Sequence, residues 1–217
     1  MIKAKVNGTQ TEIETSWDEL SFRKYLKLLN SQSNYTQIIA ILLNLPEKDV
    51  ERANFVGLDS VIQAIKFLQA PPAIDPIPKK LGDYTLPKDI TFHSVGQFET
   101  LKQEITEATK MDNLHDQTKK LAMYAAIYCQ PLNGEEFDKE KAEWLAEKFL
   151  DYPCLEVMGA GNFFMARCLS LTSGLPMSYL RKNTLLKTNR FHGLLRRSGF
   201  TRFSTMLRVM WEVMTKK

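Results

Sequence analysis

The side chains best suited to proton transfer in this sequence are its three histidines, His93, His115 and His192. His115 lies directly before Asp116, and Asp112 stands three residues upstream. Neighbouring carboxylates can tune an imidazole for proton transfer. The stretch around His115 is very polar, however, and we expect it to be an exposed helix start rather than a catalytic centre.

The three cysteines, Cys129, Cys154 and Cys168, are widely spaced, and each is embedded among apolar residues. No cysteine or histidine pair has the spacing of zinc ligands. The sequence contains neither a Gly-x-x-x-x-Gly-Lys-Ser/Thr phosphate loop nor a Gly-x-Ser-x-Gly elbow. We therefore expect buried thiols in a reduced compartment, no metal or cofactor, and no enzymatic activity.

Charge is distributed unevenly along the chain. From Val157 to Lys217 eleven basic residues stand against the single acid Glu212, a net charge of +10, so the total of +4 leaves −6 for residues 1–156. The candidate contacts to a partner or to nucleic acid are Arg181, Lys182, Lys187, Arg190, Arg196, Arg197, Arg202 and Arg208. These side chains could bind the phosphates of nucleic acid or contact the acidic half of a neighbouring copy. Alternatively, they are solvent-exposed residues on helix faces without a partner molecule.

The elements that must position these side chains begin with a hairpin. Residues 2–13 alternate on both sides of Asn7-Gly8, a pair that tolerates the positive φ angles of a tight turn. Helical spacing of apolar residues then predicts three helices. They are Phe22 to Leu29 behind the capping residue Ser21, Tyr35 to Leu43 before Pro46, and Leu58 to Leu68.

A proline-rich stretch follows, and after it the pattern starts again. Residues 70–78 hold four prolines in nine positions, which predicts a linker because proline removes backbone donors and disfavours helix. Lys80 to Pro87 resembles a second strand pair around a Gly-Asp turn, and Ser94 with Gln97 forms a capping-box pattern. Further helices are expected at Leu121 to Tyr128 and Lys141 to Leu150.

We therefore predict a mainly α fold with small β-hairpins (α+β), in which two diverged hairpin-plus-helices repeats precede a basic helical C-terminal region. The predicted parts are residues 1–69, a linker at 70–79, residues 80–156 and residues 157–217. Chance is the alternative explanation of the repeat, because any two capped amphipathic helices in succession look alike.

The C-terminal region is expected to be helical, with glycine-bearing breaks of which the first is Gly159-Ala160-Gly161. Its last helix carries a regular apolar stripe that something must cover. The members of the stripe are Phe203, Met206, Leu207, Met210, Trp211 and Met214. Either the chain's own domain or a partner subunit could cover it, and the methionines favour a partner because they adapt to irregular surfaces.

Three segments carry a family resemblance: Leu20 to Tyr25, Tyr84 to Ile90 and His93 to Phe98. A hairpin followed by a helix start of this type resembles the small assembly or neck and tail proteins of tailed bacteriophages that infect Bacteroidetes-type hosts. The resemblance covers roughly residues 1 to 165, and the basic C-terminal part departs from it.

The resemblance implies a non-enzymatic tail, neck or virion-assembly protein that contacts other phage structural proteins or copies of itself. It implies a location in the host cytoplasm during assembly, with the virion as the alternative. A nucleic-acid-binding protein that uses the arginine-rich C-terminal helices is the alternative function. The longest aliphatic run, Ile38 to Leu43, is far short of the roughly 20 apolar residues of a membrane span, so we expect neither a span nor a signal peptide.

Overall fold

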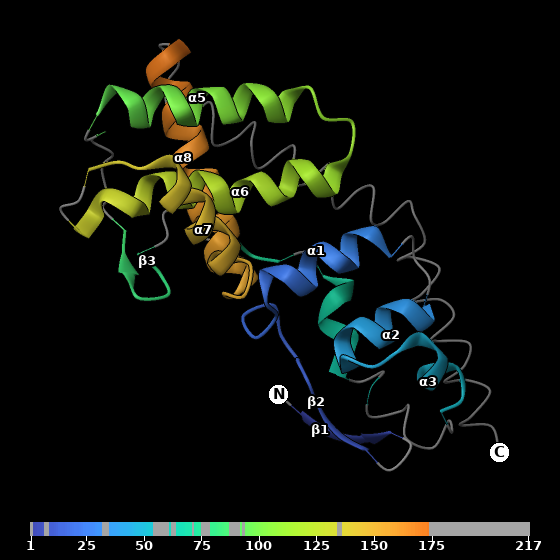
Figure 1. Cartoon of the computed structure of the whole chain (residues 1–217). Helices are drawn as coiled ribbons and strands as arrows, with labels where there is room; N and C mark the ends of the chain where they lie inside the picture. The colour runs from blue at the N-terminus through green and yellow to red at the C-terminus, as the bar shows by residue number, and fades with distance from the viewer. Residues whose placement is uncertain are drawn as a thin grey trace. The chain divides into compact units, whose positions relative to one another are not determined.

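The computed structural model describes residues 2–6, 9–31, 35–53, 61, 64–70, 72–74, 79–86, 92, 94–133 and 136–173 (Figure 1). Contacts divide them into two units. The first holds residues 2–19 and 30–72, and the second holds residues 20–29 and 73–173. The described residues are mainly helical with two small antiparallel hairpins, which confirms the predicted α+β class. The predicted division at residues 69, 79 and 156 stays a prediction.

The first unit opens with the predicted hairpin. Strand β1 (Ile2–Val6) pairs antiparallel with β2 (Thr9–Ile13), and Ile2 lies opposite Ile13. The hydroxyl of Thr11 donates a hydrogen bond to the carbonyl oxygen of Leu43 at 2.9 Å. This bond ties the hairpin to the end of a helix 32 residues further along the chain.

That helix, α2 (Tyr35–Leu43), ends at a residue with positive φ, Asn44 (53°). The N–H of Leu45 donates to the carbonyl of Ala40 at 3.0 Å and the N–H of Asn44 to that of Ile41 at 3.3 Å. This is the Schellman pattern, which satisfies the free carbonyls of a helix end. It stops α2 at Leu43, three residues before Pro46, the proline from which the stop was predicted.

Two short helices follow among the described residues of the first unit. Helix α3 (Glu47–Glu51), which the sequence did not lead us to expect, begins directly after Pro46. A 3₁₀ helix, η2 (Ile65–Gln69), stands where the end of the third helix was predicted. The ring of Trp17 meets that of Phe67 edge-on at 5.2 Å.

In the second unit, helix α1 (Phe22–Asn30) begins at the predicted cap, where the hydroxyl of Ser21 accepts the N–H of Lys24 at 3.3 Å. Backbone hydrogen bonds join the start of this helix to the chain near residue 152. The N–H of Phe22 donates to the carbonyl of Tyr152, and the N–H of Cys154 donates to the carbonyl of Leu20, both at 2.8 Å.

The second hairpin, β3 (Lys80–Leu81) and β4 (Tyr84–Thr85), turns at Gly82-Asp83 as predicted. Gly82 has a φ of +55°, and a Cβ there would lie 2.1 Å from Cε2 of Tyr152. Both facts require glycine. The N–H of Gly82 donates to Glu156 Oε2 at 2.7 Å.

Four helices form the body of the second unit: α5 (Val95–Thr109), α6 (Leu114–Cys129), α7 (Lys139–Phe149) and α8 (Cys154–Ser173). Helix α6 contacts the other three, and its residues 121–129 are all buried. In Figure 1, α5 and α6 run alongside each other and α8 crosses them. Ser94 caps α5 as predicted by accepting the N–H of Gln97 at 3.1 Å, while the Gln97 amide donates to the carbonyl of Ile127 on α6.

The predicted break at Gly159-Ala160-Gly161 is wrong, because α8 continues through these residues. Gly161 lies where α8 crosses α6, and a Cβ on it would stand 2.5 Å from the carbonyl oxygen of Leu121. The glycine therefore permits close contact between two helices. On the same pair of helices, the rings of Tyr128 and Phe164 stack with their centroids 4.1 Å apart.

Candidate protein-interaction surface

Helix α7 is amphipathic and well capped. The carboxylate of Asp138 accepts the N–H groups of Glu140 at 2.8 Å and of Lys141 at 3.3 Å, and Glu140 is a further acid in the first turn. Ala142, Leu145 and Phe149 form the buried face.

Trp144 is the large aromatic side chain on the outer face of α7, and it is 67% exposed. Nζ of Lys148 lies 5.7 Å from the centroid of its ring, within the range of a cation–π interaction. Glu140, Glu143 and Glu147 on the same helix are also exposed. A solvent-exposed tryptophan such as Trp144 is the type of side chain that anchors protein–protein contacts.

Arg23 of α1 binds two carboxylates near the end of α7. Its Nε and Nη2 donate to the two oxygens of Asp151 at 2.7 and 3.2 Å, and its Nη1 donates to Glu147 Oε1 at 2.8 Å. Planar guanidinium groups are suited to such forked binding. Hydrogen bonding from Arg23 holds the pKa of Asp151 below its usual value, and the same bonds raise the pKa of Arg23.

We expect Arg23 to make the free energy of unfolding depend on pH in the acidic range. A carboxylate with a lowered native pKa contributes stability above its unfolded pKa, about 3.9, and loses that contribution as the pH falls through the native value. The difference in unfolding free energy between wild type and Arg23→Gln should therefore be largest above pH 5 and shrink towards pH 2. Urea denaturation across this range measures it.

The matched control is Lys27→Gln, which removes one positive charge from an exposed position of the same helix. Its effect should not change between pH 6 and pH 2. A pH-independent difference for Arg23→Gln would contradict the assigned role of Asp151.

A cleft of about 380 Å³, which we call the α6–α7 cleft, lies beside α7. Apolar side chains contribute to its lining: Met111, Ala122, Met123, Ala146 and Leu150. Charged side chains also line it: Glu104, Asp116, Lys119, Lys120, Glu143 and Glu147.

An ion pair forms one wall of this cleft. Nζ of Lys120 contacts the carboxylate of Glu104, whose side chain is 7% exposed, and lies 3.4 Å from Glu107 Oε2. Burial acts to lower the pKa of Lys120, but its hydrogen bonds to Glu104 and Glu107 outweigh that effect and raise it. Burial raises the pKa of the neighbouring Tyr124. The charged side chains of this wall, Lys120, Glu104 and Glu107, are therefore paired with one another.

Of the three histidines that the sequence singled out, His115 lies among the described residues, whereas His93 and His192 lie outside them. His115 lies in the first turn of α6, whose cap is Asn113, and its Nδ1 is 2.9 Å from Asp116 Oδ1. Within the described part of the chain, no three His, Cys, Asp or Glu side chains are grouped as metal ligands.

The cysteines Cys129, Cys154 and Cys168 are free and buried, as predicted. Burial raises the pKa of Cys129 and raises that of Cys168 to about 11. Thiols protonated in this way are poor nucleophiles at neutral pH.

The predicted basic contacts, from Arg181 to Arg208, and the stripe from Phe203 to Met214 lie outside the described residues, the last of which is Ser173. Their role stays a prediction. Sequence reasoning missed Trp144 and the α6–α7 cleft. The phase of Trp144, which falls off the stripe of Ala142, Leu145 and Phe149, is the one signal that could have pointed to it.

No helix that the structure describes is both long and apolar enough to cross a bilayer. No protein-family model matches the sequence, no curated protein is significantly similar to it, and no solved structure matches it.

Proposed function

We propose that this chain is a non-enzymatic structural or assembly protein of a tailed bacteriophage, acting through contacts with other phage proteins or with copies of itself. It acts in the host cytoplasm during assembly and stays in the virion where those contacts persist. The exposed Trp144 on the outer face of α7 is the observation that carries the proposal. The family resemblance of its helix starts supports it.

The energetics of Trp144 favour a protein partner. A cation–π contact with Lys148 stabilises an exposed indole by only about 0.5–1 kcal/mol. Removing most of such a side chain from water contributes more, at about 25 cal/mol per Å² of apolar surface. Tryptophan is accordingly enriched among the few residues that dominate binding energy at interfaces.

We also propose that the two hairpin-plus-helices segments arose by duplication. Each hairpin precedes a helix whose serine cap accepts the N–H three residues on. Ser21 accepts from Lys24 and Ser94 accepts from Gln97. Both serines stand at helix starts that the sequence predicts, so their shared capping role supports the duplication.

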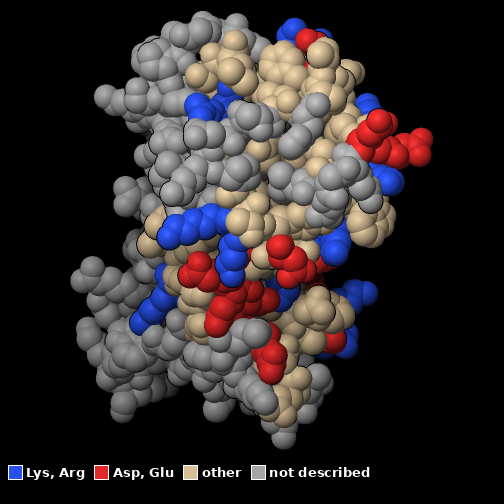
Figure 2. All heavy atoms as spheres, turned by 90° about the vertical axis from the view of Figure 1, so that its left-hand side faces the viewer, with Lys and Arg blue, Asp and Glu red and all other residues tan. Residues whose placement is uncertain are grey.

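Nucleic-acid binding is the second candidate, favoured by the net charge of +10 from residue 157 onwards. On one face of the described residues, basic side chains are mixed with acidic ones (Figure 2). This candidate rests on the basic residues of the C-terminal region. A salt-dependent DNA mobility shift that Arg196→Glu with Arg197→Glu abolishes would support this candidate, and no shift at low salt would remove it.

The protein-contact proposal predicts that Trp144→Ala weakens association by about 2 kcal/mol, or roughly thirtyfold in Kd. The fold should be unaffected, because the side chain is 67% exposed. Light scattering after size exclusion measures self-association of the 25.0 kDa chain, and mass spectrometry of purified virions finds the other partners.

Val95→Ala is the control, since Val95 is 79% exposed on α5 and should be neutral. A strict monomer that is absent from virions and from assembly intermediates would contradict the proposed function.

A further inference from the structure

We infer that the α6–α7 cleft receives the apolar stripe of residues 203–214 from a second copy of the chain, so that copies join head to tail. This inference rests on the proposed function, of which it names the partner surface. The cleft, the charges at its rim and the composition of the stripe carry it.

The cleft has the size of a binding site and a lining that is partly apolar and partly charged. Its volume of about 380 Å³ falls within the range of roughly 300–1,000 Å³ typical of ligand pockets. The apolar part of the lining consists of three long side chains and two short ones: Met111, Met123 and Leu150, with Ala122 and Ala146. A Met- and Trp-bearing segment suits such a lining, because thioethers adapt their shape to irregular apolar surfaces.

The charges at the cleft favour a basic occupant. Four carboxylates and two ammonium groups line it, which leaves a net charge of −2. Glu104 is held by Lys120 and Glu147 by Arg23, so these two acids already have strong partners. Glu143 differs, since its side chain is 59% exposed and its closest cation, Lys139, lies 4.0 Å away.

The stripe carries the complementary charge. At helical spacing, Arg202 and Arg208 fall on opposite flanks of the line from Phe203 to Met214. An arginine on one flank can therefore reach Glu143 while the apolar side chains enter the cleft. Lys119 also lines the cleft, so we place the stripe with its Arg208 flank on the α7 side, where Glu143 and Glu147 stand.

A second copy is the occupant that fits a structural protein. The cleft and the stripe are unlike surfaces, and a contact between unlike surfaces leaves each joined pair with one cleft and one stripe still available. Such contacts generate rings when the rotation closes and filaments when it does not. A phage tail or neck component needs this kind of repeated contact.

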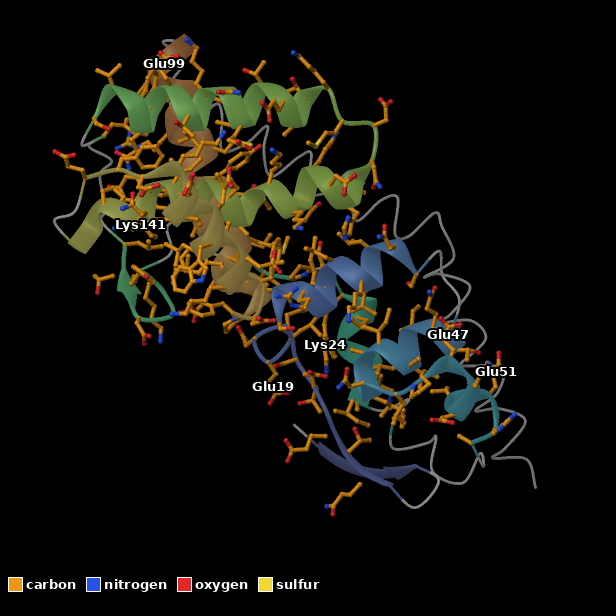
Figure 3. The ribbon with its side chains drawn as sticks, in the orientation of Figure 1. Glu19, Lys24, Glu47, Glu51, Glu99 and Lys141 are labelled. Atoms are coloured by element: carbon orange, nitrogen blue, oxygen red, sulfur yellow. The ribbon has the colours of Figure 1, made fainter. Side chains whose placement is uncertain are left out.

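Charge reversal at the rim tests the site. We expect Glu143→Arg to weaken self-association of the full chain at least about tenfold, measured by light scattering or analytical ultracentrifugation. Glu99→Arg is the matched control, because Glu99 is an exposed acid that projects from α5 and does not line the cleft (Figure 3). It changes the net charge equally and should leave association unchanged. Far-UV circular dichroism verifies that both variants are folded.

Mixing two variants tests whether the contact joins different copies. Glu143→Arg has a damaged cleft and an intact stripe, whereas Arg208→Glu has the reverse. Each alone should be mainly monomeric, and an equimolar mixture should form dimers, because one intact cleft then meets one intact stripe. If the stripe instead filled the cleft of its own chain, mixing would change nothing, and the inference would be overturned.

Two other outcomes would also overturn it: a wild-type chain that stays monomeric, or equal loss of association in Glu143→Arg and Glu99→Arg. Neither would decide the proposed function, since mass spectrometry of virions reports on that separately.

Discussion

Replacing Gly161 with alanine is expected to lower the free energy of unfolding by about 2 kcal/mol. The added Cβ would lie 2.5 Å from the carbonyl oxygen and 2.8 Å from Cα of Leu121, which are backbone atoms of α6 that cannot rotate away. Overpacking of this kind costs about 1–3 kcal/mol and occasionally more, and we place it at the upper end. Alanine returns about 1 kcal/mol through its higher helix propensity. Urea denaturation should show a lower midpoint with an unchanged slope.

Gly96→Ala is the matched control for this prediction. Gly96 is an exposed glycine near the start of α5, and the nearest atom to a Cβ there, Ser94 Oγ, is 3.9 Å away. Helix propensity is then the main effect, so the variant should be neutral or more stable than wild type by up to about 1 kcal/mol. A Gly161→Ala variant that matches the Gly96→Ala variant in stability would contradict the close crossing of α6 and α8.

The features that the sequence predicted correctly are those decided within a few residues. Ser21 and Ser94 cap helices because a serine oxygen reaches an N–H three residues on, whatever the rest of the chain does. The turn at Gly82-Asp83 follows equally from local backbone freedom. Hydrophobic spacing likewise predicted a helix from Lys141 to Leu150, where α7 lies.

The features that it missed depend on residues far apart in the chain. A glycine favours both a helix break and a close helix crossing, and only Leu121, 40 positions away, decides for the crossing at Gly161. Arg23 meets Asp151 across 128 positions. No local pattern reports such a pair. The α6–α7 cleft is likewise a property of how three helices pack, so it could not be predicted from the composition of any one of them.

The second large loss of stability is expected when the ion pair between Lys120 and Glu104 is broken. We expect Lys120→Met to lower the free energy of unfolding by about 3 kcal/mol, because it leaves the carboxylate of Glu104, whose side chain is 7% exposed, without its cation. Removing one partner of a buried pair costs about 3–5 kcal/mol, and the 20% exposure of Lys120 places this pair at the lower end.

Lys119→Met isolates this effect from a general loss of charge. Lys119 is the neighbouring, exposed lysine, so its replacement should change stability by less than about 0.5 kcal/mol. Adding Glu104→Gln to Lys120→Met removes the buried negative charge as well and should recover much of the loss, which a double-mutant cycle measures. Equal effects of the two lysine replacements would show that the pair adds nothing beyond its charge. A double variant no more stable than Lys120→Met alone would show that packing of the lysine stem, and not the stranded carboxylate, sets the cost.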